Sequence, residues 1–355
     1  MNIRQKEMYA GVVHARQDIR YEKIPVPQLK DDEVLAEVYY TGICGSDVPR
    51  VNADACHFFP NVLGHEFSGV IADVGKNVSQ NLIGQRAVGI PLVPCMECED
   101  CRKGNYSLCR HYSFIGSRRF GSFAQYVAVP AANILPITEE TDFKTAAFFE
   151  PSTVAVHGIR CADFYSGGTV LILGGGTIGL LVLQWAKILG AGKTIVVNRS
   201  REKLNYALTL GADAVISTLD ADYKEQLAAL TDQRGFDFVF ETAGSAQMME
   251  EAFGFVANKG CVCCIGTPKK SLTFSVSQWE LLNRREFRLT GSWMSYSSPF
   301  PGEEWELTSA HMRDGSLKIL PEMIDEVIPL SRIDYAFEKF RKGTVSGKIL
   351  IDSHS

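Results

Sequence analysis

Long hydrophobic runs are missing from this sequence. No stretch reaches the roughly 18 uncharged apolar residues from which a transmembrane helix is built. The most apolar segment, residues 169–189, is interrupted by four glycines. The N-terminal residues MNIRQKEMYA also lack the apolar stretch of a secretory signal. We therefore expect neither a membrane-spanning nor a secreted chain, and predict a cytoplasmic protein.

An excess of basic charge is also missing. The 355 residues include 36 Lys and Arg against 41 Asp and Glu, which gives a net charge of −5 and a pI near 5.9. The one basic cluster, at Arg118 and Arg119, is too short to follow a phosphate backbone. A nucleic-acid-binding module needs a basic face. The charge balance therefore argues against nucleic acid as a partner.

Cysteine, by contrast, is plentiful, and four of the ten cysteines stand close together. The segment PCMECEDCRKGNYSLC holds Cys95, Cys98, Cys101 and Cys109. Short loops of this spacing allow thiolates to turn back onto one tetrahedral ion, and zinc takes four such ligands in closed structural sites. Residues so close in the chain cannot be spread through a core. The quartet predicts a structural zinc site rather than a disulfide framework.

A second set of potential metal ligands surrounds this quartet in the sequence. Cys44 lies in TGICGSD, His65 and Glu66 lie in LGHEFSG, and Glu150 lies in FFEPST. A catalytic zinc keeps about three protein ligands and leaves a position open, and a thiolate, an imidazole and a carboxylate form such a set. Zinc held there would polarise a substrate hydroxyl and favour release of a hydride to a nicotinamide. Each residue alone is ambiguous, and only the combination indicates chemistry.

The chain changes character near residue 157. Before it, short alternating segments such as EFSGVIADVG predict a β-rich lobe. After it, strands and helices alternate at short intervals, which predicts βαβ units and a doubly wound parallel sheet in an α/β protein. The tail from about residue 294 is expected to return to the first lobe. We predict one domain from residues 1–157 and 294–355 and a second from residues 158–293.

A glycine-rich turn marks a dinucleotide-binding site in the second domain. Gly174, Gly176 and Gly179 follow a predicted strand and open a predicted helix, as in the G-x-G-x-x-G fingerprint. Amides near Thr177 and Ile178 would meet the pyrophosphate. Asn198 and Arg199 follow the next strand, where NAD-binding proteins usually place an acid for the ribose hydroxyls. An arginine in place of an acid favours NADP slightly over NAD.

Together these motifs resemble those of the zinc-dependent medium-chain dehydrogenase/reductase family, which includes alcohol and polyol dehydrogenases. The residues that carry the resemblance are GICGSD, GHEFSG, the cysteine quartet, Glu150-Pro151 and GGGTIG. The resemblance implies a GroES-like catalytic domain and a Rossmann domain, with an active site between them. It also implies Cys44, His65 and Glu150 as catalytic zinc ligands, with Glu66 as a direct, alternate or water-linked ligand. Ser46 matches the position that relays the alcohol proton.

Less general stretches bear on the substrate. YSFIGSRRFGSFAQY and GSWMSYSSPFPGEEWE resemble members of the family that act on sugar alcohol phosphates. Arg118 and Arg119 would bind the phosphate group of the substrate. An equal alternative is that these arginines form an ion pair or contact the cofactor. Trp293 is expected to touch the nicotinamide or the substrate. The predicted reaction is oxidation of a secondary hydroxyl to the ketose phosphate. The alternative is an unphosphorylated polyol or diol as substrate.

The resemblance also suggests a partner. Relatives of this family pair through sheet edges, and the strand VCCIG is a plausible edge for pairing with a second subunit. A homodimer or homotetramer is therefore expected, and a small-molecule polyol is the other expected partner.

Overall fold

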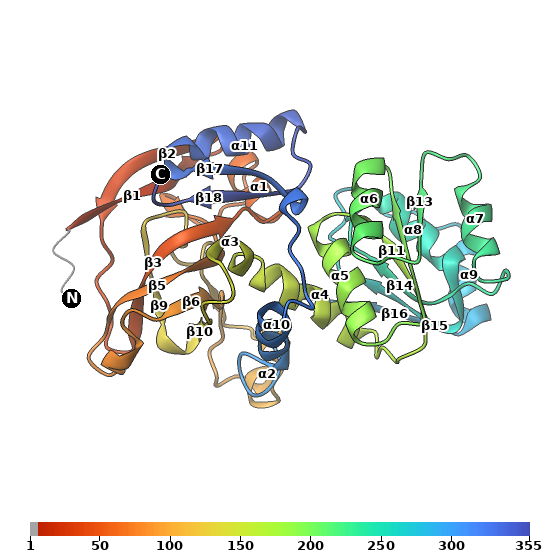
Figure 1. Ribbon diagram of the computed structural model, residues 1–355, viewed down its shortest axis with the longest axis horizontal. Helices are drawn as coiled ribbons and strands as arrows, with labels where there is room; N and C mark the ends of the chain where they lie inside the picture. Colours follow the sequence, from red (N-terminus) through yellow and green to blue (C-terminus); the bar gives the residue numbers. More distant parts are fainter. Residues whose placement is uncertain (1–5) are drawn as a thin grey trace. The chain divides into compact units, whose positions relative to one another are not determined.

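The computed structural model describes residues 6–355, which group into two compact units (Figure 1). The first unit comprises residues up to Glu150, Tyr296–Arg313 and Ile319–Ser355, and the second comprises Pro151–Ser295 and Asp314–Lys318. Part of the N-terminal segment on which the expectation about a secretory signal rests, residues 1–5, lies outside the described residues. No helix within 6–355 combines the length and apolar character needed to cross a membrane.

The first unit is built mainly from antiparallel strands. One sheet has the order β2-β1-β4, a larger one has the order β10-β6-β5-β3-β18-β17 with β9 also on β3, and β7 pairs with β8. Its strands are β1 (Glu7–Ala15), β2 (Asp18–Pro25), β3 (Glu33–Gly42), β4 (Asn61–Val62), β5 (Glu66–Val74), β6 (Arg86–Gly89), β7 (Leu92–Val93), β8 (Ser113–Phe114), β9 (Tyr126–Pro130), β10 (Ile134–Pro136), β17 (Ile324–Pro329) and β18 (Lys348–Asp352).

Short helices connect and cover these strands. They are α1 (Asp47–Asn52), α2 (Glu99–Arg102), α3 (Phe143–Ala146), α10 (Glu303–Arg313), α11 (Ile333–Lys342) and the 3-10 turns η1 (Gln80–Leu82), η2 (Tyr106–Leu108), η3 (Ala131–Asn133), η4 (Pro321–Met323) and η5 (Leu330–Arg332). Helix α11 buries Ile333 and Phe337 in one core with Val12, Val13 and Phe123. Strands β3, β5 and β9 form a second core around Phe67 and Ile71. These two cores fix the loops that carry the candidate ligands.

The second unit contains a parallel sheet with the order β13-β12-β11-β14-β15-β16. Its strands are β11 (Thr169–Leu173), β12 (Lys193–Asn198), β13 (Ala214–Ser217), β14 (Phe236–Glu241), β15 (Val256–Cys264) and β16 (Arg288–Gly291), and its helices are α5 (Thr177–Ile188), α6 (Arg201–Thr209), α7 (Tyr223–Ala229), α8 (Ala246–Phe255) and α9 (Val276–Arg285). Helix α5 contacts α6, and α8 contacts α9, around the sheet (Figure 1). The strand order reverses beside β11, as in the doubly wound nucleotide-binding folds. The predicted fold class is confirmed.

The division of the chain differs in detail from the predicted one. Helix α4 (Phe149–Cys161) contains the predicted boundary at residue 157, but along the chain the first unit ends earlier in this helix, at Glu150. Residues 314–318 join the second unit rather than the first, because the Gln184 side chain bonds the backbone N–H and C=O of Lys318 at 2.8 and 3.0 Å. A side-chain contact between positions so far apart leaves no local signal in the sequence.

The sheet edge also differs from the expectation. Strand β15, which contains most of VCCIG, pairs with β14 on one side and β16 on the other. It is therefore an interior strand, and the expectation that it forms the edge is wrong. Within the described residues the edges of this sheet are β13 and β16, and Leu289 on β16 is 43% exposed. The periodicity identified both strands, but their order in the sheet is a tertiary property.

Candidate metal centres and dinucleotide site

Cys44, His65 and Glu66 gather at one end of the β3–β5 pair. Their ligand atoms all lie within 4.8 Å of one another, and we call these three residues the Cys44 cluster. The register pairs Gly42 with Glu66, which brings the loop after β3 against the start of β5. A Cβ at Gly42 would lie 2.2 Å from Glu66 Oε2, so a larger residue there would displace the Glu66 carboxylate. The two glycine-flanked motifs, distant in the sequence, meet through this register.

Asp47 supports the Cys44 cluster, and the sequence analysis did not single it out. Its carboxylate accepts a hydrogen bond from Cys44 N at 3.1 Å, and its Oδ1 faces His65 Nδ1 at 3.5 Å. Burial lowers the pKa of His65, but the charges and hydrogen bonding of Asp47 and Cys44 together outweigh burial and raise that pKa well above its usual value. Since Nδ1 faces Asp47, Nε2 is the ring nitrogen left for a ligand bond. The only sequence signal was the position of Asp47 inside GICGSD.

Lys348 is a second residue that the sequence analysis missed. Its Nζ lies 2.8 and 2.6 Å from the two carboxylate oxygens of Glu66 and 3.3 Å from Ile43 O. Both side chains are buried, at 8% and 2% exposure. Each of these two buried charges is therefore paired with the opposite charge, which offsets the cost of burying it. Glu66 is held by a lysine from β18, which favours a supporting role for Glu66 over direct ligation.

Glu150 lies outside the group of described residues that meet within 4.8 Å, but it shares their electrostatic environment. It is the second residue of α4. Burial raises the pKa of Glu150 to about 7, with the charges of His65 and Lys348 lowering it and that of Glu66 raising it. Glu150 therefore lies within electrostatic range of His65 and adds a carboxyl group to the candidate oxygen donors.

The chemistry of these side chains fits a catalytic zinc. A thiol, an imidazole and carboxylates are the donors that such sites use. His65 Nδ1 and Asp47 Oδ1 are buried, face each other and make no hydrogen bond with described residues. A metal-bound histidine usually presents its second nitrogen to a carboxylate in this way. Ser46 caps α1 beside this set, and its backbone N–H points to Cys44 Sγ at 3.5 Å.

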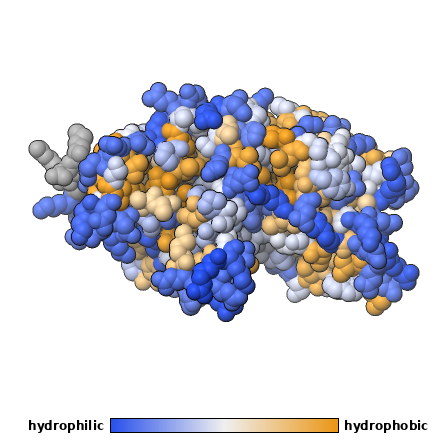
Figure 2. Space-filling view, turned by 90° about the horizontal axis from the view of Figure 1, so that it is seen from below, coloured by the Kyte–Doolittle hydropathy of each residue, from blue (hydrophilic) through white to orange (hydrophobic). Residues whose placement is uncertain are grey.

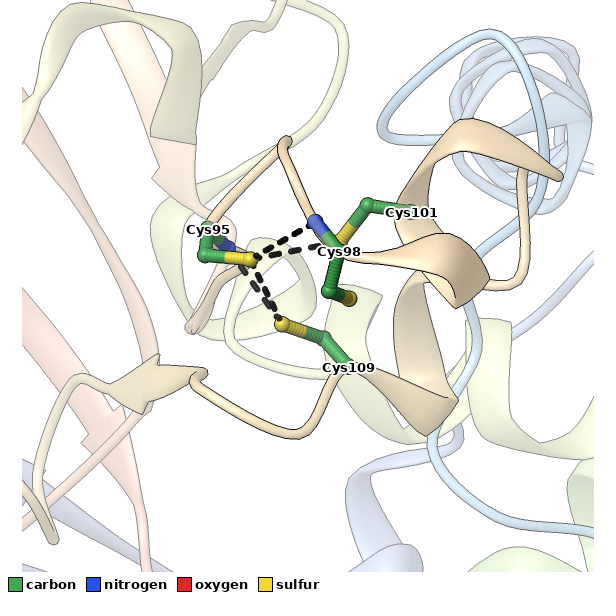
Figure 3. Close-up of side chains that lie close together, drawn as sticks. All are labelled: Cys95, Cys98, Cys101 and Cys109. Atoms are coloured by element: carbon green, nitrogen blue, oxygen red, sulfur yellow. Dashed lines mark hydrogen bonds between the residues drawn. The ribbon is translucent and has the colours of Figure 1, made fainter.

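The cysteine quartet forms the other candidate metal centre (Figure 3). Cys95 Sγ lies 3.5 Å from Cys109 Sγ and 4.0 Å from Cys101 Sγ, and all four sulfurs lie within 4.8 Å. Backbone amides support the thiolates: Cys98 N donates to Cys95 Sγ, and the N–H of Cys101 lowers the pKa of Cys98 to about 6. Four convergent sulfurs on two short turns fit a closed tetrahedral zinc site.

The glycine turn of the second unit has the geometry that a pyrophosphate needs. Gly174 adopts φ +115°, and a Cβ at Gly179 would lie 1.8 Å from Gly174 O, so both positions require glycine. A Cβ at Gly176, the N-cap of α5, would meet nothing within 4 Å, which leaves the amides near Thr177 and Ile178 accessible. The Thr242 hydroxyl, which the sequence analysis missed, donates to Leu173 O and Gly174 O and fixes the turn.

Asn198 and Arg199 lie beside this turn. A Cβ on Gly175 would lie 3.4–3.5 Å from the Asn198 side chain. Arg201 forms an ion pair with Asp220 at 3.1 Å, whereas Arg199 is exposed and has no ion pair with the described residues. Of these two arginines, Arg199 is therefore the one whose guanidinium has no ion pair with the described residues.

The three residues predicted to contact the substrate lie in different surroundings. Arg118 is exposed and lies over the Tyr112 ring, 4.5 Å from its centroid. Arg119 instead binds Glu33 at 2.7 Å and Ala128 O at 3.0 Å. A guanidinium committed to a carboxylate is not available for a phosphate, so the prediction for Arg119 is not kept. Trp293 belongs to the second unit, just after β16, and is 56% exposed.

Comparisons with known proteins agree with this geometry. Residues 30–139 match the family model of the alcohol dehydrogenase GroES-like domain, and residues 177–310 match that of zinc-binding dehydrogenases. Galactitol 1-phosphate 5-dehydrogenase of Escherichia coli K12 is 34% identical over 94% of this chain and 96% of its own. The sorbitol dehydrogenase of Bacillus subtilis is 34% identical over 75% of this chain and 77% of its own.

Two further comparisons extend this result. The D-arabitol-phosphate dehydrogenase of Enterococcus avium is 30% identical over 93% of this chain and 93% of its own. The crystal structure of galactitol-1-phosphate dehydrogenase from Escherichia coli has a TM-score of 0.92 and 34% identity, covering 97% of this chain and all of its own. Similarity of this extent, over both units, reaches beyond a shared fold.

Proposed function

This chain belongs to the zinc-dependent medium-chain dehydrogenase/reductase family, and we propose that it oxidises a secondary hydroxyl of a sugar alcohol phosphate to the ketose phosphate. The observation that carries the proposal is the gathering of Cys44, His65 and Glu66 within 4.8 Å, with Asp47 behind His65. Two relatives that span nearly the whole chain are named for phosphorylated polyols. The reaction moves a hydride from the carbinol carbon to a nicotinamide and a proton to solvent.

The chain's own residues supply binding and proton transfer in this proposal. Cys44, His65 and Glu150 would hold the zinc, which when bound acts as a Lewis acid on the substrate hydroxyl. Asp47 fixes the imidazole tautomer, and Lys348 neutralises Glu66. The Ser46 hydroxyl takes the alcohol proton, because Ser46 is exposed at the start of α1 next to Cys44. The amides at the start of α5 bind the pyrophosphate.

For the coenzyme we propose NADP in preference to NAD. Asn198 brings no carboxylate that would repel a 2′-phosphate, and Arg199 is not ion-paired with a described residue. Arg199→Asp is expected to raise KM for NADP+ about 10- to 100-fold and to improve use of NAD+. Arg201→Gln is the matched control, because Arg201 is paired with Asp220. Equal use of both coenzymes by the wild type would overturn this preference.

The experiment that tests the substrate class is a panel of initial rates with NAD+ and NADP+. Galactitol 1-phosphate, arabitol phosphate and the free polyols are compared on zinc-loaded enzyme. Turnover that depends on the phosphate supports the proposal. Turnover of free polyols or diols without any phosphate advantage would replace the proposal with the alternative, a dehydrogenase of unphosphorylated polyols. The similarity to a sorbitol dehydrogenase supports this alternative.

We also propose that two copies pair through β16. Beyond β15 this strand has no other described neighbour, and an unpaired edge is a template for another strand. Leu289 on β16 and Val276 and Trp279 on α9 expose 43%, 80% and 49% of their surface. Figure 2 shows hydrophobic residues, in orange, scattered among hydrophilic ones on the face that it draws. Light scattering should show that the wild type is a dimer or a larger oligomer. The variant Leu289→Arg should be monomeric. A monomeric wild type would contradict pairing through β16.

A further inference from the structure

Glu241 is a buried carboxylate at the carboxyl end of β14, and the proposed function gives it no role. Its side chain is fully buried. No basic side chain within residues 6–355 forms an ion pair with it. Burial raises the pKa of Glu241, and only hydrogen bonds from backbone N–H groups lower it. The charge of this carboxylate is therefore balanced by the backbone alone.

The backbone that follows Glu241 folds around its carboxylate. Ala243 N and Ser245 N donate to Oε1, and Gly244 N donates to Oε2, each at 3.1 Å. Gly244 adopts φ +64°, and successive N–H groups in a turn with such a residue form an anion-binding nest. This nest lies directly before α8, whose N-cap is Ser245. The anion that the nest holds is thus the protein's own carboxylate.

The corresponding turn after β11 is open by contrast. Gly176, the N-cap of α5, makes no side-chain cap, and a Cβ there would meet nothing within 4 Å. Strands β11 and β14 are parallel neighbours in which Leu173 pairs with Glu241, so both turns lie at the same edge of the sheet. Helix N-termini attract anions. Because Glu241 fills the turn before α8, of these two turns only the one before α5 is left for the pyrophosphate.

Glu241 also ties the loop after β15 to the loop after β14. Its backbone C=O accepts hydrogen bonds from Ile265 N and Gly266 N, both at 2.9 Å. A Cβ on Gly266 would lie 2.5 Å from Glu241 Oε2, and a Cβ on Gly244 would lie 2.4 Å from Thr267 O. The two loops therefore pack closely on each other and share Glu241 as their support.

These two loops lie in the half of the sheet that the adenosine does not use. In a doubly wound fold each half of the sheet binds one nucleotide, and the dinucleotide crosses where the strand order reverses. Here the order reverses between β11 and β14. The proposed function assigns Asn198 and Arg199, which follow β12, to the adenosine ribose. The ends of β14 and β15 are then left for the nicotinamide half.

We propose that Glu241 is a positioning residue for the nicotinamide half of the coenzyme, because its carboxylate fixes the loops after β14 and β15 on which that half would rest. The inference rests on the proposed function, which requires a nicotinamide coenzyme. Glu241→Gln removes the charge and replaces one acceptor oxygen by an NH2 donor. At least one amide of the nest then loses its acceptor, and a buried donor without a partner is costly.

The test compares the dissociation constants of NADPH and of adenosine 2′,5′-bisphosphate, which contains only the adenosine half. In Glu241→Gln the constant for NADPH should rise about 10- to 100-fold, while that for the bisphosphate should stay near the wild-type value. Isothermal titration calorimetry measures both, with NADH and AMP as the pair if the wild type prefers NAD.

Asp237→Asn is the matched control. Asp237 lies near the other end of β14, where its Oδ2 accepts hydrogen bonds from Thr169 N and Thr169 Oγ1, both at 2.8 Å. Losing this carboxylate should lower the stability of the fold and leave the ratio of the two dissociation constants unchanged.

The outcomes separate this inference from the proposed function. A wild type that binds neither NADPH nor NADH would overturn both. If the wild type binds coenzyme, an unchanged ratio in Glu241→Gln, or equal weakening of both ligands, would overturn the role of Glu241 alone. Should Glu241→Gln fail to fold, Glu241→Asp takes its place, because it keeps the charge but is one methylene shorter. The ratio should then rise again, and an unchanged ratio would again overturn the role of Glu241.

Discussion

At the scale of single residues, the Cys44 cluster depends on two buried charges that are not candidate ligands. Asp47 is fully buried and Lys348 is 8% exposed. Each is held in place by a counter-group of the cluster, Asp47 facing His65 and Lys348 bonding Glu66. Supporting groups of this kind orient metal ligands and tune their basicity. The candidate ligands were predicted from the sequence, but their supports were not.

Asp47→Asn tests this support directly. The amide keeps the size of the side chain but removes the charge that faces His65 Nδ1. We expect activity and catalytic zinc affinity to fall about 10- to 100-fold, measured by initial rates and by metal analysis after dialysis. Asp54→Asn, at an exposed position in the loop after α1, serves as control. Unchanged rate and zinc content in Asp47→Asn would show that the carboxylate does not orient His65.

At the scale of elements, the glycines of the turn between β11 and α5 differ in whether packing requires them. The sequence pattern does not distinguish the two cases. Gly179 is needed for packing, because any Cβ would collide with Gly174 O. A Cβ at Gly176 would meet nothing within 4 Å, so packing does not require glycine there, and we expect this glycine to serve the approach of a ligand. We therefore expect glycine to have two different physical roles within this one motif.

This difference predicts two contrasting variants. Gly179→Ala should destabilise the fold by about 1–3 kcal/mol, as overpacking does, and weaken coenzyme binding. Gly176→Ala should leave the stability near that of the wild type and weaken coenzyme binding only. Urea unfolding and coenzyme fluorescence titrations measure the two effects. Equal stability of both variants would contradict the packing role of Gly179.

Another element-scale contact joins β17 to α11. Lys339 Nζ donates to Asp325 and Glu326, both at 2.6 Å. Burial raises the pKa of Asp325, but the bonds from Lys339 and Ser346 outweigh burial and lower it. Because the folded-state pKa is depressed, this carboxylate stabilises the fold above its unfolded pKa of about 3.9, and the contribution is lost as pH falls through the folded value.

Lys339→Met should therefore reduce stability by about 1.5–3 kcal/mol at pH 7. The difference from the wild type should shrink progressively when both are unfolded with urea at pH values decreasing from about 3.9, as Asp325 becomes protonated in the folded protein. Lys342→Met, which removes only an exposed pair with Glu338, is the control. A difference that stays constant with pH would show that the Asp325 charge contributes nothing.

At the scale of the whole molecule, the described residues of the first unit hold two separate sets of metal donors. We expect about two zinc ions per chain, one in each set. Cys109→Ser should leave about one zinc and lower the melting temperature, because a structural zinc contributes folding free energy. Cys264→Ser, on β15 and outside both sets, should keep both ions. Full zinc content in Cys109→Ser would rule out the quartet as a zinc site.

The sequence by itself determined the features that depend on neighbours along the chain. Cysteine spacing, the glycine turn and the alternation of strands and helices are local, so backbone geometry fixes them wherever the segment lies. They sufficed for the fold class and for Cys44, His65 and the quartet as candidates.

Only the tertiary structure decided which distant residues meet. It paired Lys348 with Glu66 across 282 positions and Arg119 with Glu33 across 86, and made β16 rather than β15 an edge of the sheet. Such contacts follow from strand register and loop packing, and these minimise the free energy of the whole chain rather than of any single segment.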